Sequence, residues 1–173
     1  MRFLGGSIGL VGLMAVGSAW AQTSPVESTM QVSAGVPASC SMSTQGGIHL
    51  PQYNPVSKGT ASDTTASIPF TVRCNRQSAP VYVSLDQGLA PAAGSSCSDP
   101  LRTMVSESGK SLPYRLYWGP SETVVWGCEG ANRLPVGFEQ VIENQLNIWT
   151  VVPAGSDADV GDYADTVTVS IEF

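Results

Sequence analysis

Basic residues and histidine are scarce in this sequence. Only 8 of its 173 residues are lysine or arginine, against 14 aspartates and glutamates, which gives a formal net charge of −6. Proteins that bind nucleic acid or rest on an anionic membrane need a basic patch, so neither partner is expected. His49 is the single imidazole, lies between Ile48 and Leu50, and is interpreted as a structural or surface residue rather than a catalytic base. We expect no enzymatic activity.

Metal-ligand patterns are lacking as well. The four cysteines include no C-x-x-C pair and there is one histidine, which argues against zinc. Four aspartates near the C-terminus have D-x-D spacing that suggests calcium: Asp157, Asp159, Asp162 and Asp165. However, Gly161 comes one place early for an EF-hand loop, and Thr168 stands where its bidentate glutamate belongs. We therefore expect a solvated turn there, with no metal and no cofactor.

The N-terminus has the pattern of a secretory signal peptide. Met1-Arg2 leads into an almost uncharged run, residues 3–16, and Ala19-Trp20-Ala21 forms an A-x-A cleavage pattern. The apolar run is shorter than the roughly 20 residues of a membrane span. We expect cleavage after residue 21, no membrane span afterwards, and a remaining chain that fits one domain.

Four cysteines in an exported chain predict two disulfide bonds. Three connectivities are open for Cys40, Cys74, Cys97 and Cys128. Pairing Cys40 with Cys74 and Cys97 with Cys128 is favoured, because each bond then closes a moderate loop that contributes roughly 3 to 4 kcal/mol.

Period-two alternation of apolar and polar residues dominates the rest of the chain. The clearest example is the C-terminus, where one face of a strand running to the last residue is formed by Tyr163, Val167, Val169, Ile171 and Phe173. Similar runs occur at 68–74, 81–85, 113–118 and 146–152, separated by clusters of Gly, Ser, Pro and Asp. Short strands at this spacing predict an all-β sandwich.

A further alternating run precedes the first cysteine. Met30, Val32, Ala34 and Val36 alternate with Gln31, Ser33 and Gly35. Such a strand pairs either within its own sheet or with another molecule, by strand addition. The alternation itself leaves both open.

An ordered set of short motifs resembles one family over nearly the whole chain after residue 21. The motifs are Cys40, Tyr53-Asn54-Pro55, Val72-Arg73-Cys74, residues 81–88, Arg102-Thr103-Met104, residues 112–118, Trp126-Gly127 and residues 161–169. Together they are similar to the spore coat U domain family, which includes pilins of the archaic chaperone-usher pathway. Cys40 and Cys74 match the family's disulfide positions, whereas Cys97 and Cys128 lie outside its usual pattern, as does Leu50-Pro51-Gln52-Tyr53.

The resemblance implies an incomplete immunoglobulin-like sandwich that is completed by a donated strand. It assigns residues 1–21 to a signal peptide, 22–39 to a donor-strand extension with Met30, Val32, Ala34 and Val36, and 40–173 to the domain. The Tyr163–Phe173 strand would form one wall of the acceptor groove and pair with a periplasmic chaperone. It further implies an outer-membrane usher, neighbouring pilus subunits as partners, and a cell-surface pilus that supports adhesion and biofilm formation.

Aromatic residues offer an alternative, a secreted carbohydrate-binding sandwich. The candidates for a stacking surface are Tyr114, Tyr117, Trp118, Trp126 and Trp149. Tyr114 and Trp118 share a strand face with Leu116 and are expected in the core, whereas Tyr117 is expected to be the most exposed of the group.

Overall fold

The computed structural model describes residues 25, 27–56, 63–75, 79–121, 123–137 and 143–173. The predicted signal peptide, residues 1–21, lies outside these residues. Two compact units are distinguished, residues 1–35 and residues 36–173. Within the described part of the chain, no helix is long and apolar enough to cross a membrane.

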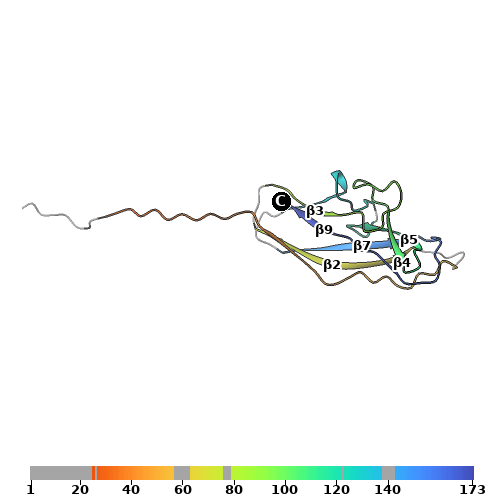
Figure 1. The fold of residues 1–173 in the computed structure, drawn as a ribbon. Helices are drawn as coiled ribbons and strands as arrows, with labels where there is room; N and C mark the ends of the chain where they lie inside the picture. The colour runs from red at the N-terminus through yellow and green to blue at the C-terminus, as the bar shows by residue number, and fades with distance from the viewer. Residues whose placement is uncertain (1–24, 26, 57–62, 76–78, 122, 138–142) are drawn as a thin grey trace, which may run out of the picture. The chain divides into compact units, whose positions relative to one another are not determined.

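The second unit is built from two β-sheets, as the sequence predicts (Figure 1). Its strands are β1 (Cys40–Thr44), β2 (Thr64–Cys74), β3 (Val81–Leu85), β4 (Arg102–Ser106), β5 (Ser111–Tyr117), β6 (Leu134–Val136), β7 (Glu143–Val152), β8 (Tyr163–Ala164) and β9 (Val169–Glu172). A 3₁₀ turn, η1, spans Gly130–Asn132. One sheet has the order β1-β2-β7-β5-β4-β8 and the other β6-β3-β9, and the paired strands are antiparallel.

Alternating apolar residues of both sheets meet in one core. β5 shows the pattern clearly, because Leu112, Tyr114 and Leu116 are buried while the residues between them are exposed. Trp126 is fully buried at the centre, with its ring centroid 5.8 Å from that of Phe70. Its indole N–H donates to the carbonyl oxygen of Val83 at 2.9 Å, so its one polar atom is satisfied.

Both disulfide bonds have the favoured connectivity. Cys40 is bonded to Cys74 and joins β1 to β2 at the first residue pair of their ladder. Cys97 is bonded to Cys128 and joins two loops. Loop length therefore predicted the pairing correctly.

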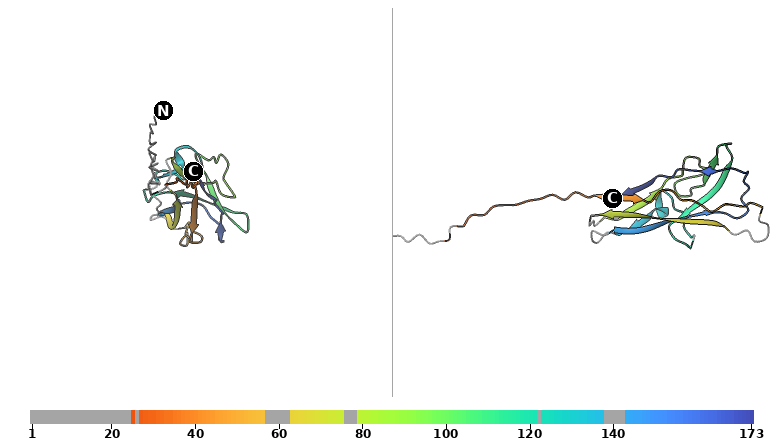
Figure 2. Two further views of the ribbon diagram at one scale, coloured as in Figure 1. Left: turned by 90° about the vertical axis from the view of Figure 1, so that its left-hand side faces the viewer. Right: turned by 90° about the horizontal axis from the view of Figure 1, so that it is seen from below.

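The C-terminal segment differs from the predicted continuous strand. β8 pairs with β4 in the six-stranded sheet, whereas β9 pairs with β3 in the three-stranded sheet. Residues 165–168 between them form no strand, because the chain crosses there from one sheet to the other. The half-buried alternation nevertheless continues through the crossing. Figure 2 shows that the C-terminus lies at the same end of the sandwich as the start of β1.

Candidate functional site

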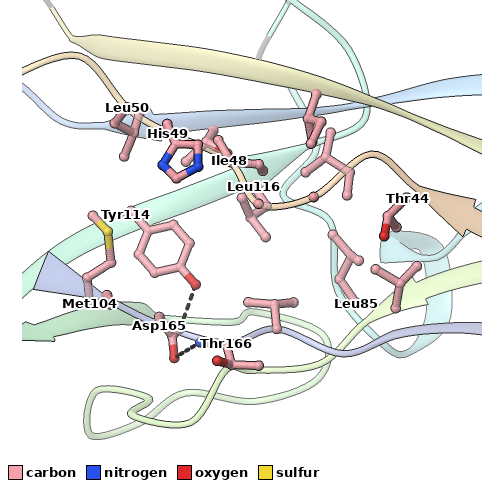
Figure 3. A pocket seen from close by; sticks show the side chains of 18 of the residues that line it. Thr44, Ile48, His49, Leu50, Leu85, Met104, Tyr114, Leu116, Asp165 and Thr166 are labelled. Atoms are coloured by element: carbon pink, nitrogen blue, oxygen red, sulfur yellow. Dashed lines mark hydrogen bonds between the residues drawn. The ribbon is translucent and has the colours of Figure 1, made fainter.

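A groove, apolar along the part that begins at Thr44, runs between two segments that are distant in the sequence. One wall is formed by residues 44–55, which follow β1, and the other by residues 158–169, which lead through β8 toward β9. Two hollows of ≈ 500 Å³ and ≈ 700 Å³ lie along it. They share the lining residues Ile48, His49, Leu50, Met104 and Tyr163, so they are adjacent, and Figure 3 shows the first of them.

The floor of the groove is the core of the sandwich. Phe70 of β2, Leu116 of β5 and Ile148 of β7 contribute from the six-stranded sheet, and Leu85 contributes from β3. Several apolar side chains that pack on this core are only partly buried: Ile48, Leu50, Ile68, Met104, Leu146, Tyr163, Val167, Val169 and Ile171. Water therefore reaches apolar side chains that a closed sandwich would bury, which is the mark of a ligand or interaction site.

The predicted wall residues line the groove only in part. Tyr163, Val167 and Val169 line it. Ile171 packs on the core without lining the hollows, and Phe173 is 55% exposed. Since β9 is an edge strand of the three-stranded sheet, one side of it is available for a further strand.

The opposite wall was not predicted from the sequence. Residues 45–55 form no strand, although they follow directly on β1. Tyr53 anchors the far end of this segment, because its hydroxyl donates to the carbonyl oxygen of Ser156 at 2.8 Å. The Tyr53-Asn54-Pro55 motif was the available signal, since it belongs to the ordered pattern, but nothing local says what the tyrosine binds.

Two aspartates hold the C-terminal wall at its crossing between the sheets. The Oδ1 atom of Asp86 accepts hydrogen bonds from the N–H groups of Gly88, at 2.9 Å, and Thr168, at 3.0 Å. The Oδ1 atom of Asp165 accepts from the N–H groups of Leu89, at 2.9 Å, and of the next residue, Thr166, at 2.8 Å. The two carboxylates thus join the turn after β3 to the crossing segment.

The close approach of these segments requires Gly88. Its φ is +78°, and a Cβ atom at this position would lie 2.1 Å from Oδ2 of Asp165. That same oxygen accepts the hydroxyl hydrogen of Tyr114 at 2.6 Å in the groove (Figure 3). Motif residues some eighty positions apart in the sequence therefore meet at one point of the wall.

Burial and hydrogen bonding together shift the pKa values of Tyr114 and Asp86 at this part of the wall. Burial first, and then the hydrogen bond to Asp165, raise the pKa of Tyr114, so its hydroxyl remains a donor. Partial burial by itself raises the pKa of Asp86, but hydrogen bonds from Thr168 and Gly88 outweigh it and hold this pKa below the usual 3.8. Asp165 is thus a half-buried wall residue that accepts three hydrogen bonds, whereas Asp157, Asp159 and Asp162 are exposed.

The buried side chain of Arg102 supports the wall, because it binds the backbone at the end of β3 and in the turn that follows. Arg102 is 1% exposed, and its guanidinium donates to the carbonyl oxygens of Leu85, at 3.1 Å, and Trp126, at 2.8 Å, as well as that of Asp86, at 2.8 Å from Nε. Burial lowers the pKa of this guanidinium below the ordinary value of arginine. Arg102 belongs to the Arg102-Thr103-Met104 motif. The sequence does not show its role, because the carbonyl oxygens that it binds come together only in the folded chain.

The predicted donor residues form no strand. Met30, Val32 and Val36 are 85%, 82% and 83% exposed, and Ala34 is exposed too. Whether the segment pairs with its own sheet or with another molecule stays a prediction.

The aromatic candidates do not form an exposed cluster. Tyr117 was expected to be the most exposed of the group but is 6% exposed, and Val125 forms an antiparallel bridge to it. Tyr114 and Trp126 are buried, while Trp118 and Trp149 are half-buried. The prediction for Tyr117 was wrong, since strand alternation reports the face of a residue but not what covers that face.

Comparisons with known proteins place these features in a family context. The family model described as Spore Coat Protein U domain matches residues 26–170. Protein U of Myxococcus xanthus is 31% identical over 160 residues, which cover 88% of this chain and 88% of that protein. A solved structure, the chaperone–tip adhesion subunit pre-assembly complex CsuC–CsuE from the archaic chaperone-usher Csu pili of Acinetobacter baumannii, contains a chain that matches with a TM-score of 0.54 and 26% identity. The match covers 80% of this chain and 40% of that chain.

Proposed function

Because this chain belongs to the Spore Coat Protein U domain family and has an incomplete immunoglobulin-like fold of the chaperone-usher pilin kind, we propose that it is a structural subunit of a surface pilus. Subunits would join by donor-strand exchange, in which the extension of one chain fills the groove of the next. The observation that supports this proposal is the coexistence of an open apolar groove and an exposed, alternating apolar extension in one chain.

The free energy of such a contact is large enough for stable assembly. Full burial of Met30, Val32 and Val36 would contribute roughly 5 to 9 kcal/mol, an upper estimate. A strand added to the edge of β9 also forms a main-chain ladder, which removes an aggregation-prone edge. Donation from one copy to the next is heterologous and does not close, so it produces a filament.

The same groove would also bind a chaperone before assembly. A periplasmic chaperone would cover it until an outer-membrane usher exchanges the chaperone for the next subunit's extension. Export through the periplasm to the cell surface agrees with two disulfide bonds. The pilus would support adhesion and biofilm formation, and the subunit itself needs no catalytic residue or cofactor.

Removal of the extension tests this function. The intact chain and a chain lacking residues 22–36 are expressed in the periplasm with a cognate chaperone, and their size distributions are compared by chromatography and electron microscopy. We expect ladders or rods from the intact chain. The shortened chain should stall as a one-to-one complex with the chaperone, because it accepts a strand but has none to donate.

A chaperone-independent monomer from both chains would contradict the proposal. In that case the sandwich would be complete in itself, and glycan binding would be the next function to measure. As a matched control, replacement of Gln31 and Ser33 by alanine should leave assembly intact, because these residues alternate with the apolar ones.

A further inference from the structure

A short link joins the apolar extension to the domain. Pro37, Ala38 and Ser39 separate Val36, the last of the alternating apolar residues, from Cys40 at the start of β1. All three link residues are exposed, so hydrophobic burial contributes little to their placement. Hydrogen bonds hold them instead, and the partner is the residue that directly follows β2.

Asn75 is that partner, and it binds the link through both its main chain and its side chain. Its backbone N–H donates to the carbonyl oxygen of Ser39 at 3.0 Å, next to the disulfide-bonded pair of Cys40 and Cys74. Its side-chain Oδ1 accepts from the N–H of Ser39 at 3.0 Å, and its Nδ2 donates to the carbonyl oxygen of Pro37 at 2.7 Å. The ladder between β1 and β2 is thereby extended beyond its last residue pair.

The side-chain amide of Asn75 spans Ala38. The carbonyl oxygen of Pro37 belongs to the peptide group before Ala38, and the N–H of Ser39 belongs to the peptide group after it. Because one planar amide binds both peptide groups, a rotation about φ or ψ of Ala38 would break at least one of the two hydrogen bonds. The middle residue of the link is therefore restrained as well as its neighbours.

The beginning of the link is restricted by its proline. The ring of Pro37 fixes the φ of this residue at about −65°. The same ring disfavours helical conformations for the preceding residue, so Val36 is confined to extended ones, and its β-branched side chain is stiff. Together with the hydrogen bonds of Asn75, these restrictions act on every residue from Val36 to Ser39.

We propose that the clamp, which consists of Asn75 and its hydrogen bonds to residues 37–39, makes a stiff joint between consecutive subunits of the pilus. This inference rests on the proposed function, in which the next subunit holds Val36, and it adds the geometry of the joint. The residue held by one subunit directly precedes the first residue clamped by the other, so no freely rotating residue lies between them. Asn75 is thus a positioning residue, which fixes the direction in which the chain leaves the domain.

Loss of the clamp should make the pilus bend more easily. Asn75→Ala removes the two side-chain hydrogen bonds but changes neither the groove nor the extension, so assembly should continue. We expect the persistence length of the filaments in electron micrographs to fall at least about threefold, because an unrestrained link behaves as a flexible tether. A second variant carries two glycines between Val36 and Pro37. It keeps Asn75, adds freely rotating residues, and should show the same loss of stiffness.

Asn147→Ala is the matched control. Asn147 is an exposed asparagine of β7 outside the groove lining, and no hydrogen bond of its side chain is found in the part of the chain that the structure describes. Its filaments should be as stiff as those of the unmodified chain. Hydrogen exchange in the chaperone complex reports on the clamp before assembly. The N–H of Ser39 should exchange at least about tenfold faster in Asn75→Ala than in the unmodified chain.

The possible results separate the inference from the proposed function. If the filaments of Asn75→Ala and of the two-glycine variant are as stiff as those of the control, the inference is wrong while donor-strand assembly stands. Equal exchange of the Ser39 N–H with and without the asparagine side chain would overturn it too. If Asn75→Ala alone does not assemble, the stiffness of the two-glycine filaments decides. If the unmodified chain forms no filaments, the proposed function fails, and the inference with it.

Discussion

At the scale of single residues, Asp165 shows how one side chain positions the groove. Its carboxylate accepts two backbone N–H groups and the hydroxyl of the buried Tyr114. Replacement of Asp165 by alanine removes all three acceptor contacts and leaves the tyrosine hydroxyl without its partner. Because hydrogen bonds to charged groups are worth about 1.5–3 kcal/mol each and are not additive, we expect the free energy of unfolding to fall by about 2 to 4 kcal/mol in chemical denaturation.

Asp162 provides the control for this substitution. It is an exposed aspartate of the same segment, and no hydrogen bond of its side chain is found in the part of the chain that the structure describes. Asp162→Ala should change stability by less than about 0.5 kcal/mol. Equal losses for the two variants would show that Asp165 has no special role in the wall.

At the scale of elements, the second disulfide bond stabilises two loops away from the groove. The backbone carbonyl oxygen of Cys97 accepts the N–H of Cys128 at 3.0 Å, and a Cβ atom on Gly127 would lie only 2.2 Å from that oxygen. The bond closes a loop with a sequence separation of 31. Replacing both cysteines by alanine should lower the free energy of unfolding by roughly 3 to 4 kcal/mol, measured by denaturation of oxidised protein. Polymerisation should persist, because the groove lining includes neither loop.

The first disulfide bond gives the contrasting case. Cys40 and Cys74 have a similar sequence separation of 34, but their bond joins β1 to β2 just before the groove wall. Removing it should cost a similar amount of stability and also slow polymerisation. Loss of assembly on removal of the Cys97–Cys128 bond alone would contradict this division of roles.

At the scale of the whole molecule, the domain should accept the extension as a separate peptide. A synthetic peptide of residues 27–39, added to the chaperone complex of the chain lacking residues 22–36, is expected to displace the chaperone and complete the sandwich. A Val32→Asp peptide should do so at least about tenfold more slowly, because burying an unpaired carboxylate costs several kcal/mol. Native electrophoresis follows the exchange. Equal rates for both peptides would mean that the peptide does not enter the apolar groove.

Much of the fold could be predicted from the sequence because its signals are local. Alternation in the 81–85 run matches β3 to the residue, and the 68–74, 113–118 and 146–152 runs lie mainly within β2, β5 and β7. The cysteine spacings predicted both bonds, since closing a short loop is favoured by chain entropy. The ordered motifs indicated the family, and the alternation from Met30 to Val36 singled out the extension.

The groove itself was decided by tertiary structure. The segment from Thr44 to Pro55 has no repeating pattern that marks it as a wall, and it becomes one only because Tyr53 binds a carbonyl oxygen about a hundred residues later. The crossing at residues 165–168 is likewise invisible in a regular alternation, since it depends on Asp86 and Gly88 arriving beside it from β3. The sequence by itself determined which residues alternate and which family the chain resembles, and it favoured one of three possible cysteine pairings. Which edges stay unpaired depends on contacts between distant segments, and those exist only once the chain has folded.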